Sequence, residues 1–196
     1  MGTNSINTEA RRSRSAQILC AICVSVVICL YFASYYITGV RFVGGEGVVW
    51  QRYSSDCGAA ALQMVFSHFD IASDYEDLAR GLGVTSEGTS MLRLKRVAEA
   101  KGLLCRGWRL TARDLPDIPL PAILFLRRNH FVVLDSYSPG GDLVIRDPAR
   151  GRLQLSMRKL ESIWGGETLL FTKLGMDSAA SMRWFGSSPN SERSHS

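Results

Sequence analysis

Hydrophobic and polar positions divide the chain into regions with different periodicity. Residues 16–40 contain no charged side chain and are almost continuously apolar. Between Cys57 and His68 the apolar residues recur at helical spacing. From about Leu103 the pattern changes to strand-like runs, of which 122–126 and 130–137 stand out. The domain after the apolar stretch is therefore expected to hold helices first and strands later, in an α+β fold.

Three shorter helices are expected at 75–80, 91–101 and 157–164. Asp74 is placed to cap the first of these, because its carboxylate can accept a hydrogen bond from a first-turn N–H. In the second, Leu92, Val97 and Ala98 are expected to line the packed side. These helices would join the Cys57–His68 helix in covering a sheet.

Further strands are expected at 103–110, 143–146 and 168–173, with a hairpin turn at 149–151. The segment Ser138–Asp142 has the composition of a hairpin turn and joins two neighbouring strands. His130 begins the first strand of that hairpin, and Asp147 follows the end of the second. Antiparallel pairing would therefore bring the two side chains together at one end of the sheet.

Cys57 is expected in the first turn of its helix, after Asp56 as a possible N-cap. The unpaired N–H groups and the positive end of the helix dipole at that position favour a thiolate. A cysteine followed far downstream by His130 and then Asp147 has the order of a thiol nucleophile, its base and the carboxylate that orients the base. Gln51 could donate its amide N–H to an oxyanion. Taken alone, a single cysteine beside an alanine-rich helix is more often a small buried apolar residue than a nucleophile.

Several motifs in one order carry a resemblance to a known family: Gln51, Asp56-Cys57-Gly58, Gly88-Thr89-Ser90-Met91, His130-Phe131-Val132-Val133-Leu134, Asp147-Pro148-Ala149 and Trp164-Gly165-Gly166. Over about 48–174 the chain resembles the bacteriocin-processing cysteine peptidases, the double-glycine leader peptidases of peptide-exporting ATP-driven transporters. The resemblance implies a papain-like fold with N-terminal helices packed on an antiparallel sheet. It also implies that Cys57 is the nucleophile, His130 the base, Asp147 the orienting residue and Gln51 the oxyanion donor.

The resemblance further implies a peptide or protein substrate with a Gly-Gly leader, cut after the glycine pair. No nucleotide-binding glycine loop occurs in these residues, so an export transporter would be a separate polypeptide. Two alternatives stay open. The domain could bind a leader or a secretion partner without cutting it, or the same residues could carry out acyl transfer in place of hydrolysis.

Charge and cysteine content exclude some other classes of function. The net charge of +5 is spread along the chain as scattered Arg and Lys pairs, which argues against a nucleic-acid partner. Three of the five cysteines lie within the apolar stretch, without the further ligands that zinc requires. No cofactor or metal is expected. Cys105 is interpreted as a buried small hydrophobe, and a redox role for it stays open.

The apolar stretch is long enough to cross a bilayer, and Tyr35 and Tyr36 lie near its end. A cleaved signal peptide is the alternative, but Tyr31 stands where a small residue is needed before a cut. More arginines precede the stretch than follow it. This bias predicts a single-pass protein of the inner (cytoplasmic) membrane, with the N-terminus cytoplasmic and the catalytic domain periplasmic.

The expected organisation is thus a disordered basic tail over 1–15, one transmembrane helix over 16–40, a Gly-rich stem over 41–47, a papain-like peptidase domain over 48–175 and a Ser-rich disordered tail over 176–196. Within the last segment, Trp184-Phe185 is a possible small contact.

Overall fold

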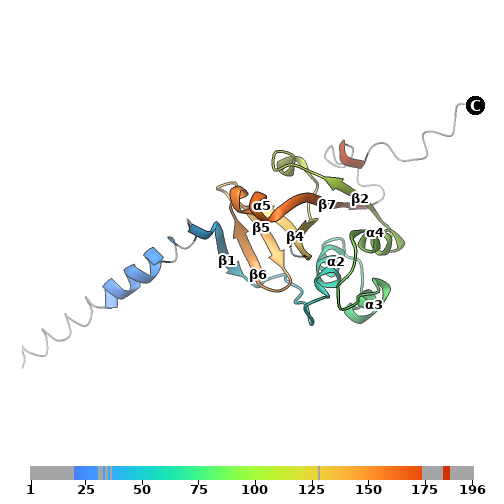
Figure 1. Ribbon diagram of the computed structural model, residues 1–196, viewed down its shortest axis with the longest axis horizontal. Helices are drawn as coiled ribbons and strands as arrows, with labels where there is room; N and C mark the ends of the chain where they lie inside the picture. Colours follow the sequence, from blue (N-terminus) through green and yellow to red (C-terminus); the bar gives the residue numbers. More distant parts are fainter. Residues whose placement is uncertain are drawn as a thin grey trace, which may run out of the picture. The chain divides into compact units, whose positions relative to one another are not determined.

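A computed structural model describes residues 20–30, 33, 35, 37–127, 129–173 and 183–185. The chain separates into two compact units, Met1–Val40 and Arg41–Ser196, which are considered individually. The second unit has an α+β fold in which helices pack against an antiparallel sheet, as the sequence predicts (Figure 1).

Three helices follow one another before the central strands, namely α2 (Cys57–His68), α3 (Tyr75–Gly81) and α4 (Met91–Ala100). Asp74 caps α3 by accepting a hydrogen bond from the N–H of Asp77, and Ser90 caps α4 in the same way. The packed side of α4 differs from the prediction, because Leu92 is 54% exposed and Leu94 is fully buried. Ala98 is buried and Val97 packs against the core as predicted, and Leu94, four residues before Ala98, takes the place of Leu92.

The sheet has seven strands in the order β1-β6-β5-β4-β3-β7-β2. Its strands are β1 (Val40–Gly44), β2 (Leu103–Arg109), β3 (Ala122–Leu126), β4 (His130–Tyr137), β5 (Leu143–Asp147), β6 (Gly151–Leu155) and β7 (Trp164–Lys173). A 3-10 turn, η1 (Leu115–Asp117), follows β2, and α5 (Met157–Ile163) precedes β7. The expected hairpin is present, with the N–H of Ser138 donating to the carbonyl of Asp142 at 2.8 Å between β4 and β5.

Apolar side chains fill both faces of the central strands. In β4, Phe131 and Val133 join the core beneath α2, whereas Val132 and Leu134 are buried on the opposite face. The helix α2 packs on β4 and α4 packs on β2, so one face of the sheet carries the N-terminal helices. This packing fixes the start of α2 beside the start of β4.

Gly58, the second residue of α2, lies at a close approach between α2 and α4. A Cβ atom there would lie 2.6 Å from Cγ2 of Thr89 and 3.3 Å from the ring of Phe131. Thr89 cannot easily turn away, because its hydroxyl donates a hydrogen bond to the carbonyl of Leu82.

We expect Gly58→Ala to lower the free energy of unfolding by about 1–3 kcal/mol, because overpacking outweighs the better helix propensity of alanine. Thermal and urea unfolding followed by circular dichroism would measure the change. Gly81→Ala is the matched control, since no atom lies within 4 Å of a Cβ at that helical glycine. Equal or greater stability of Gly58→Ala would contradict the packing argument.

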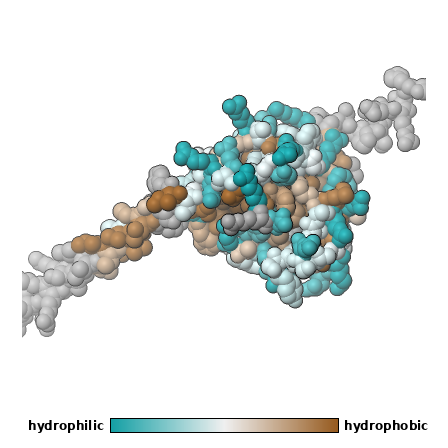
Figure 2. Space-filling view, viewed as in Figure 1, coloured by the Kyte–Doolittle hydropathy of each residue, from teal (hydrophilic) through white to brown (hydrophobic). Residues whose placement is uncertain are grey.

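The prediction of a membrane anchor over 16–40 is wrong. The predicted inner-membrane location with a periplasmic domain, which depended on that anchor, is wrong as well. Among the residues that the structure describes, no helix has both the length and the apolar character to cross a bilayer. The described residues 20–30 are helical. Apolar residues, coloured brown in Figure 2, predominate in this segment.

The segment predicted as a Gly-rich stem contributes the edge strand β1. Glycine composition suggested a linker, but Gly44 and Phe42 close around Gly151 of β6, where a Cβ would lie 2.8 Å from the Phe42 ring. Arg41 also donates a hydrogen bond to Gln154 of β6. Pairing with β6, a contact distant in sequence, decides the conformation of this stretch.

Within the tail predicted as disordered over 176–196, only 183–185 lie in the described part of the chain. They form a helical turn in which Trp184 and Phe185 are buried. The indole N–H of Trp184 donates to the carbonyl of Asp117 at 2.8 Å, and its ring meets Trp108 edge-on at 5.3 Å. Trp108 lies three positions after the core residue Cys105, so this contact covers the sheet face opposite α2.

Candidate active site

Cys57 is the first residue of α2, as its spacing predicts. It is only 4% exposed, and its Sγ lies 4.0 Å from the carbonyl oxygen of Asn129. Asn129 adopts a positive φ of 55°, a left-handed conformation that Asn tolerates better than most residues, directly before β4 begins. The thiol therefore lies at the junction between the helix start and the strand start.

His130 begins β4, and its Nε2 lies 2.8 Å from Oδ1 of Asp147 at the end of β5. The hairpin thus brings the two side chains together in the predicted way. Burial of the ring lowers the pKa of His130, but the hydrogen bond to Asp147 and the contact with Cys57 outweigh burial and raise that pKa to about 9. Because Nε2 is engaged by Asp147, Nδ1 is the nitrogen left for the thiol.

Asp147 is fully buried, and both of its oxygens accept hydrogen bonds. Oδ1 also accepts from the N–H of Ala149 at 2.9 Å, and Oδ2 accepts from Nε of Arg150 at 2.7 Å. Burial raises the pKa of this carboxyl, but His130 and the two other donors outweigh burial and lower the pKa to about 2. The carboxylate is therefore ionised over the whole neutral range and fixes the orientation of the imidazole.

Gln51 lies next to the loop that follows Asp147, because its backbone N–H donates to the carbonyl of Pro148 at 3.0 Å. Its side-chain Nε2 donates to the carbonyl of Tyr53 at 2.9 Å, and its Oε1 is buried without a partner among the described residues. An amide nitrogen carries two hydrogens, so one N–H of Gln51 is engaged by Tyr53 and one remains to be donated.

A cavity of about 470 Å³ lies beside α2, between the segment that precedes Cys57 and α3. Its lining combines aromatic, small and charged residues: Tyr53, Ser55, Asp56, Tyr75, Glu76, Ala79, Arg80, Gly83, Val84, Thr85 and Ser86. Asp56 links this cavity to the site, because the next residue is Cys57. The described residues contain no group of three or more His, Cys, Asp or Glu side chains that could hold a metal ion.

Sequence reasoning missed Arg150, the N–H of Ala149 and Asn129, and it gave Asp56 a capping role that the structure does not show. Arg150 and the N–H of Ala149 hold Asp147, and the spacing of Arg150 three residues after the carboxylate was the available signal. Asn129 supplies the carbonyl next to the thiol, which only the fold reveals. Asp56 stands at the N-cap position of α2, but its side chain does not cap the helix.

The antiparallel sheet covered by N-terminal helices is the α+β fold of papain-like peptidase domains. Residues 46–174 match the Peptidase C39 family, and the chain belongs to this family. A solved structure with the same fold is a double glycine motif protease from an AMS/PCAT transporter in complex with the leader peptide. It is 30% identical with a TM-score of 0.62, over 65% of this chain and 91% of that one.

Two relatives show the range of proteins in which this domain occurs. The probable microcin-H47 secretion/processing ATP-binding protein MchF of Escherichia coli is 31% identical over 62% of this chain. The probable functional amyloid protease FapD of Pseudomonas aeruginosa is 30% identical over 65% of this chain. The chain covers 17% of MchF and 60% of FapD, so the similarity concerns the peptidase domain.

Proposed function

We propose that the chain is a cysteine endopeptidase that cleaves a leader peptide after a Gly-Gly pair during maturation or export of a secreted peptide or protein. The observation that carries the proposal is the position of Cys57 at the start of α2, in contact with an imidazole whose Nε2 is held by the buried carboxylate of Asp147. An export transporter is the proposed partner, by analogy with the transporter origin of similar domains.

In the proposed mechanism, the thiol proton resides on Nδ1 of His130 as an imidazolium, and the thiolate of Cys57 attacks the carbonyl carbon of the scissile peptide bond. The N–H of Cys57 and the remaining N–H of Gln51 stabilise the oxyanion. The C–N bond then breaks, and His130 gives its proton to the leaving amine. Water, activated by His130, hydrolyses the thioester and restores the thiol.

The Gly-Gly specificity is tested with a synthetic leader peptide that ends in Gly-Gly followed by a few residues of cargo. Mass spectrometry of the products is expected to show one cut after the second glycine. The matched control is the same peptide with Gly-Gly replaced by Val-Val, for which kcat/KM is expected to fall by about 10²-fold or more, because side chains at the cut would collide with the site. Equal cleavage of both peptides would contradict the proposed specificity.

Binding without cleavage is the second candidate, and the low exposure of Cys57 together with the bond from Gln51 to Tyr53 favours it. The two candidates differ in the chemistry of the thiol. A peptidase should alkylate with iodoacetamide at Cys57 well below the pH at which a free thiol reacts, whereas a binding domain should show no such acceleration between pH 5 and 8. Cys105 serves as an internal reference, because burial raises its pKa to about 12.

A further inference from the structure

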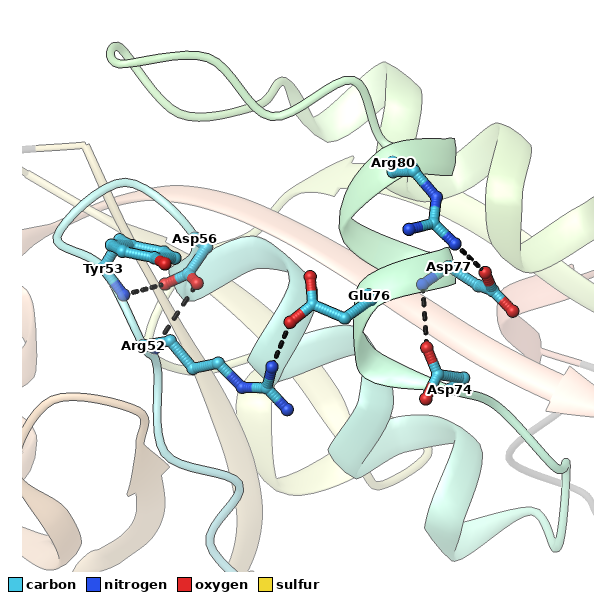
Figure 3. Close-up of polar contacts among 7 residues, drawn as sticks. All are labelled: Arg52, Tyr53, Asp56, Asp74, Glu76, Asp77 and Arg80. Carbon is cyan, nitrogen blue, oxygen red and sulfur yellow. Dashed lines mark hydrogen bonds and ion pairs between the residues drawn. The ribbon is translucent and has the colours of Figure 1, made fainter.

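Asp56 is buried next to Cys57, with only 3% of its surface exposed. It stands at the N-cap position of α2, but its side chain does not cap the helix. Its carboxylate turns back along the chain and accepts hydrogen bonds from two backbone N–H groups, Oδ2 from Arg52 at 3.3 Å and Oδ1 from Tyr53 at 3.1 Å (Figure 3). Asp74, the N-cap of α3, shows the usual arrangement, because its Oδ1 accepts a hydrogen bond from the N–H of Asp77 in the first turn of its own helix.

The orientation of this carboxylate has two consequences for the site. It shapes the segment just after Gln51, including Tyr53, whose carbonyl accepts from the Gln51 side chain. It also leaves the first turn of α2 without a side-chain cap. The N–H groups of Ala59 and Ala60 donate to the backbone carbonyl of Asp56, and no partner for the N–H of Cys57 occurs within the described ranges. First-turn N–H groups point out of a helix, so this donor remains available.

The same segment is held from its other side by α3. The guanidinium of Arg52 pairs with Glu76 (Figure 3). It also lies 4.6 Å from the centre of the Tyr75 ring. Burial and the neighbouring charge of Asp56 raise the pKa of Tyr75, so the phenol stays neutral beside the carboxylate. The segment 51–53 is thus fixed at both its backbone and its side chains.

We propose that Asp56 is a positioning residue for the oxyanion site: by holding the backbone of Arg52 and Tyr53 it sets the Gln51 amide, and by not capping α2 it leaves the N–H of Cys57 open to the substrate oxygen. This inference rests on the proposed peptidase function. It assigns to Asp56 no contact with the reacting atoms. Asp56 acts through Gln51 and through the start of the helix.

The test compares Asp56→Asn with the parent chain on the Gly-Gly leader peptide. Asparagine keeps the shape but offers one acceptor oxygen where two backbone N–H groups need one each, so the segment should lose its fixed conformation. We expect kcat to fall by about 10- to 100-fold with KM changed less than about threefold, as for weakened oxyanion stabilisation. Asp74→Asn is the matched control and should retain kcat, because Asn caps a helix as well as Asp.

Two further measurements separate positioning from general damage. Alkylation of Cys57 by iodoacetamide forms no oxyanion, so its limiting rate at high pH should stay within about twofold of the parent. In the Gln51→Ala background, Asp56→Asn should lower kcat by a clearly smaller factor than in the parent, because the part of its effect that acts through Gln51 is already absent. Asp56→Ser is a second variant that supplies a capping hydroxyl to α2, so it should fold while losing kcat to a similar extent.

The inference would be overturned if the losses of Asp56→Asn and Gln51→Ala multiplied in the double variant. An unchanged kcat in Asp56→Asn, or an alkylation rate that falls in parallel with kcat, would also overturn it. Each of these results would leave the peptidase function intact. A parent chain that neither cleaves the leader peptide nor shows accelerated alkylation would overturn the proposed function, and the inference with it.

Discussion

Replacement of Cys57 by alanine is expected to reduce kcat on a Gly-Gly leader peptide by at least about 10⁴-fold, because removal of a nucleophile leaves only binding and oxyanion stabilisation. KM should change little, since the sulfur contributes little to substrate binding. Single-turnover assays with mass spectrometry would measure the loss. The variant should still fold, because the loss of one buried sulfur atom costs only about 1 kcal/mol and alanine is a good helix former.

The control for this substitution is Cys105→Ala. Cys105 lies on β2, is fully buried and belongs to the core rather than to the site. Its replacement should leave kcat within about twofold of the parent while lowering stability by about 1 kcal/mol. Cleavage that survives in Cys57→Ala, or that is lost in Cys105→Ala, would assign the nucleophile elsewhere.

Replacement of Asp147 by alanine is expected to lower kcat by about 10²- to 10³-fold, because the imidazole of His130 loses the partner that orients it. Asp147→Asn should lie between this variant and the parent, since asparagine can still accept a hydrogen bond from Nε2 but carries no charge. Asp135→Asn is the control. Asp135, like Asp147, forms two ion pairs, in its case with Arg146 and Arg152, but it lies outside the proposed catalytic group.

The pH dependence of activity provides a second test of the interaction between Asp147 and His130, because it predicts the direction in which the alkaline limit of activity moves. In the parent, His130 has a pKa of about 9, so the protonated imidazole and the activity that depends on it should be lost as pH rises through about 9. Asp147 raises that pKa, so both Asp147 variants should lose activity at lower pH than the parent, toward the ordinary histidine value of about 6.5. An alkaline limb that does not move would mean that Asp147 does not act on His130.

Local sequence pattern predicted most of the fold that surrounds the site. The strand bounds at 122–126 and 130–137 are confirmed, because apolar runs bounded by turn residues define them. The Asp74 cap of α3 is also confirmed, because a short polar side chain before a helix satisfies a first-turn donor. The meeting of His130 with Asp147 followed from hairpin pairing alone.

Contacts between segments distant in sequence account for most of what the sequence did not predict. β7 begins at Trp164, four residues before the predicted start, because it pairs with both β3 and β2. The strand β1 depends on β6 in the same way. Asp56 is of a residue type that often caps helices, but the backbone N–H groups of Arg52 and Tyr53 bind its carboxylate in place of the first turn of α2. The length of the apolar stretch at 16–40 suggested a bilayer span, which the described helices do not provide.

The docking of Trp184 has a practical consequence for how the protein is prepared. A recombinant fragment ended where the family match ends, at residue 174, would remove this indole and leave Trp108 and the Asp117 carbonyl bare to solvent. Bare aromatic surface of that kind promotes self-association, and poor yield from such a fragment would be mistaken for instability of the peptidase itself. Fragments for crystallisation or assay are better ended after Phe185.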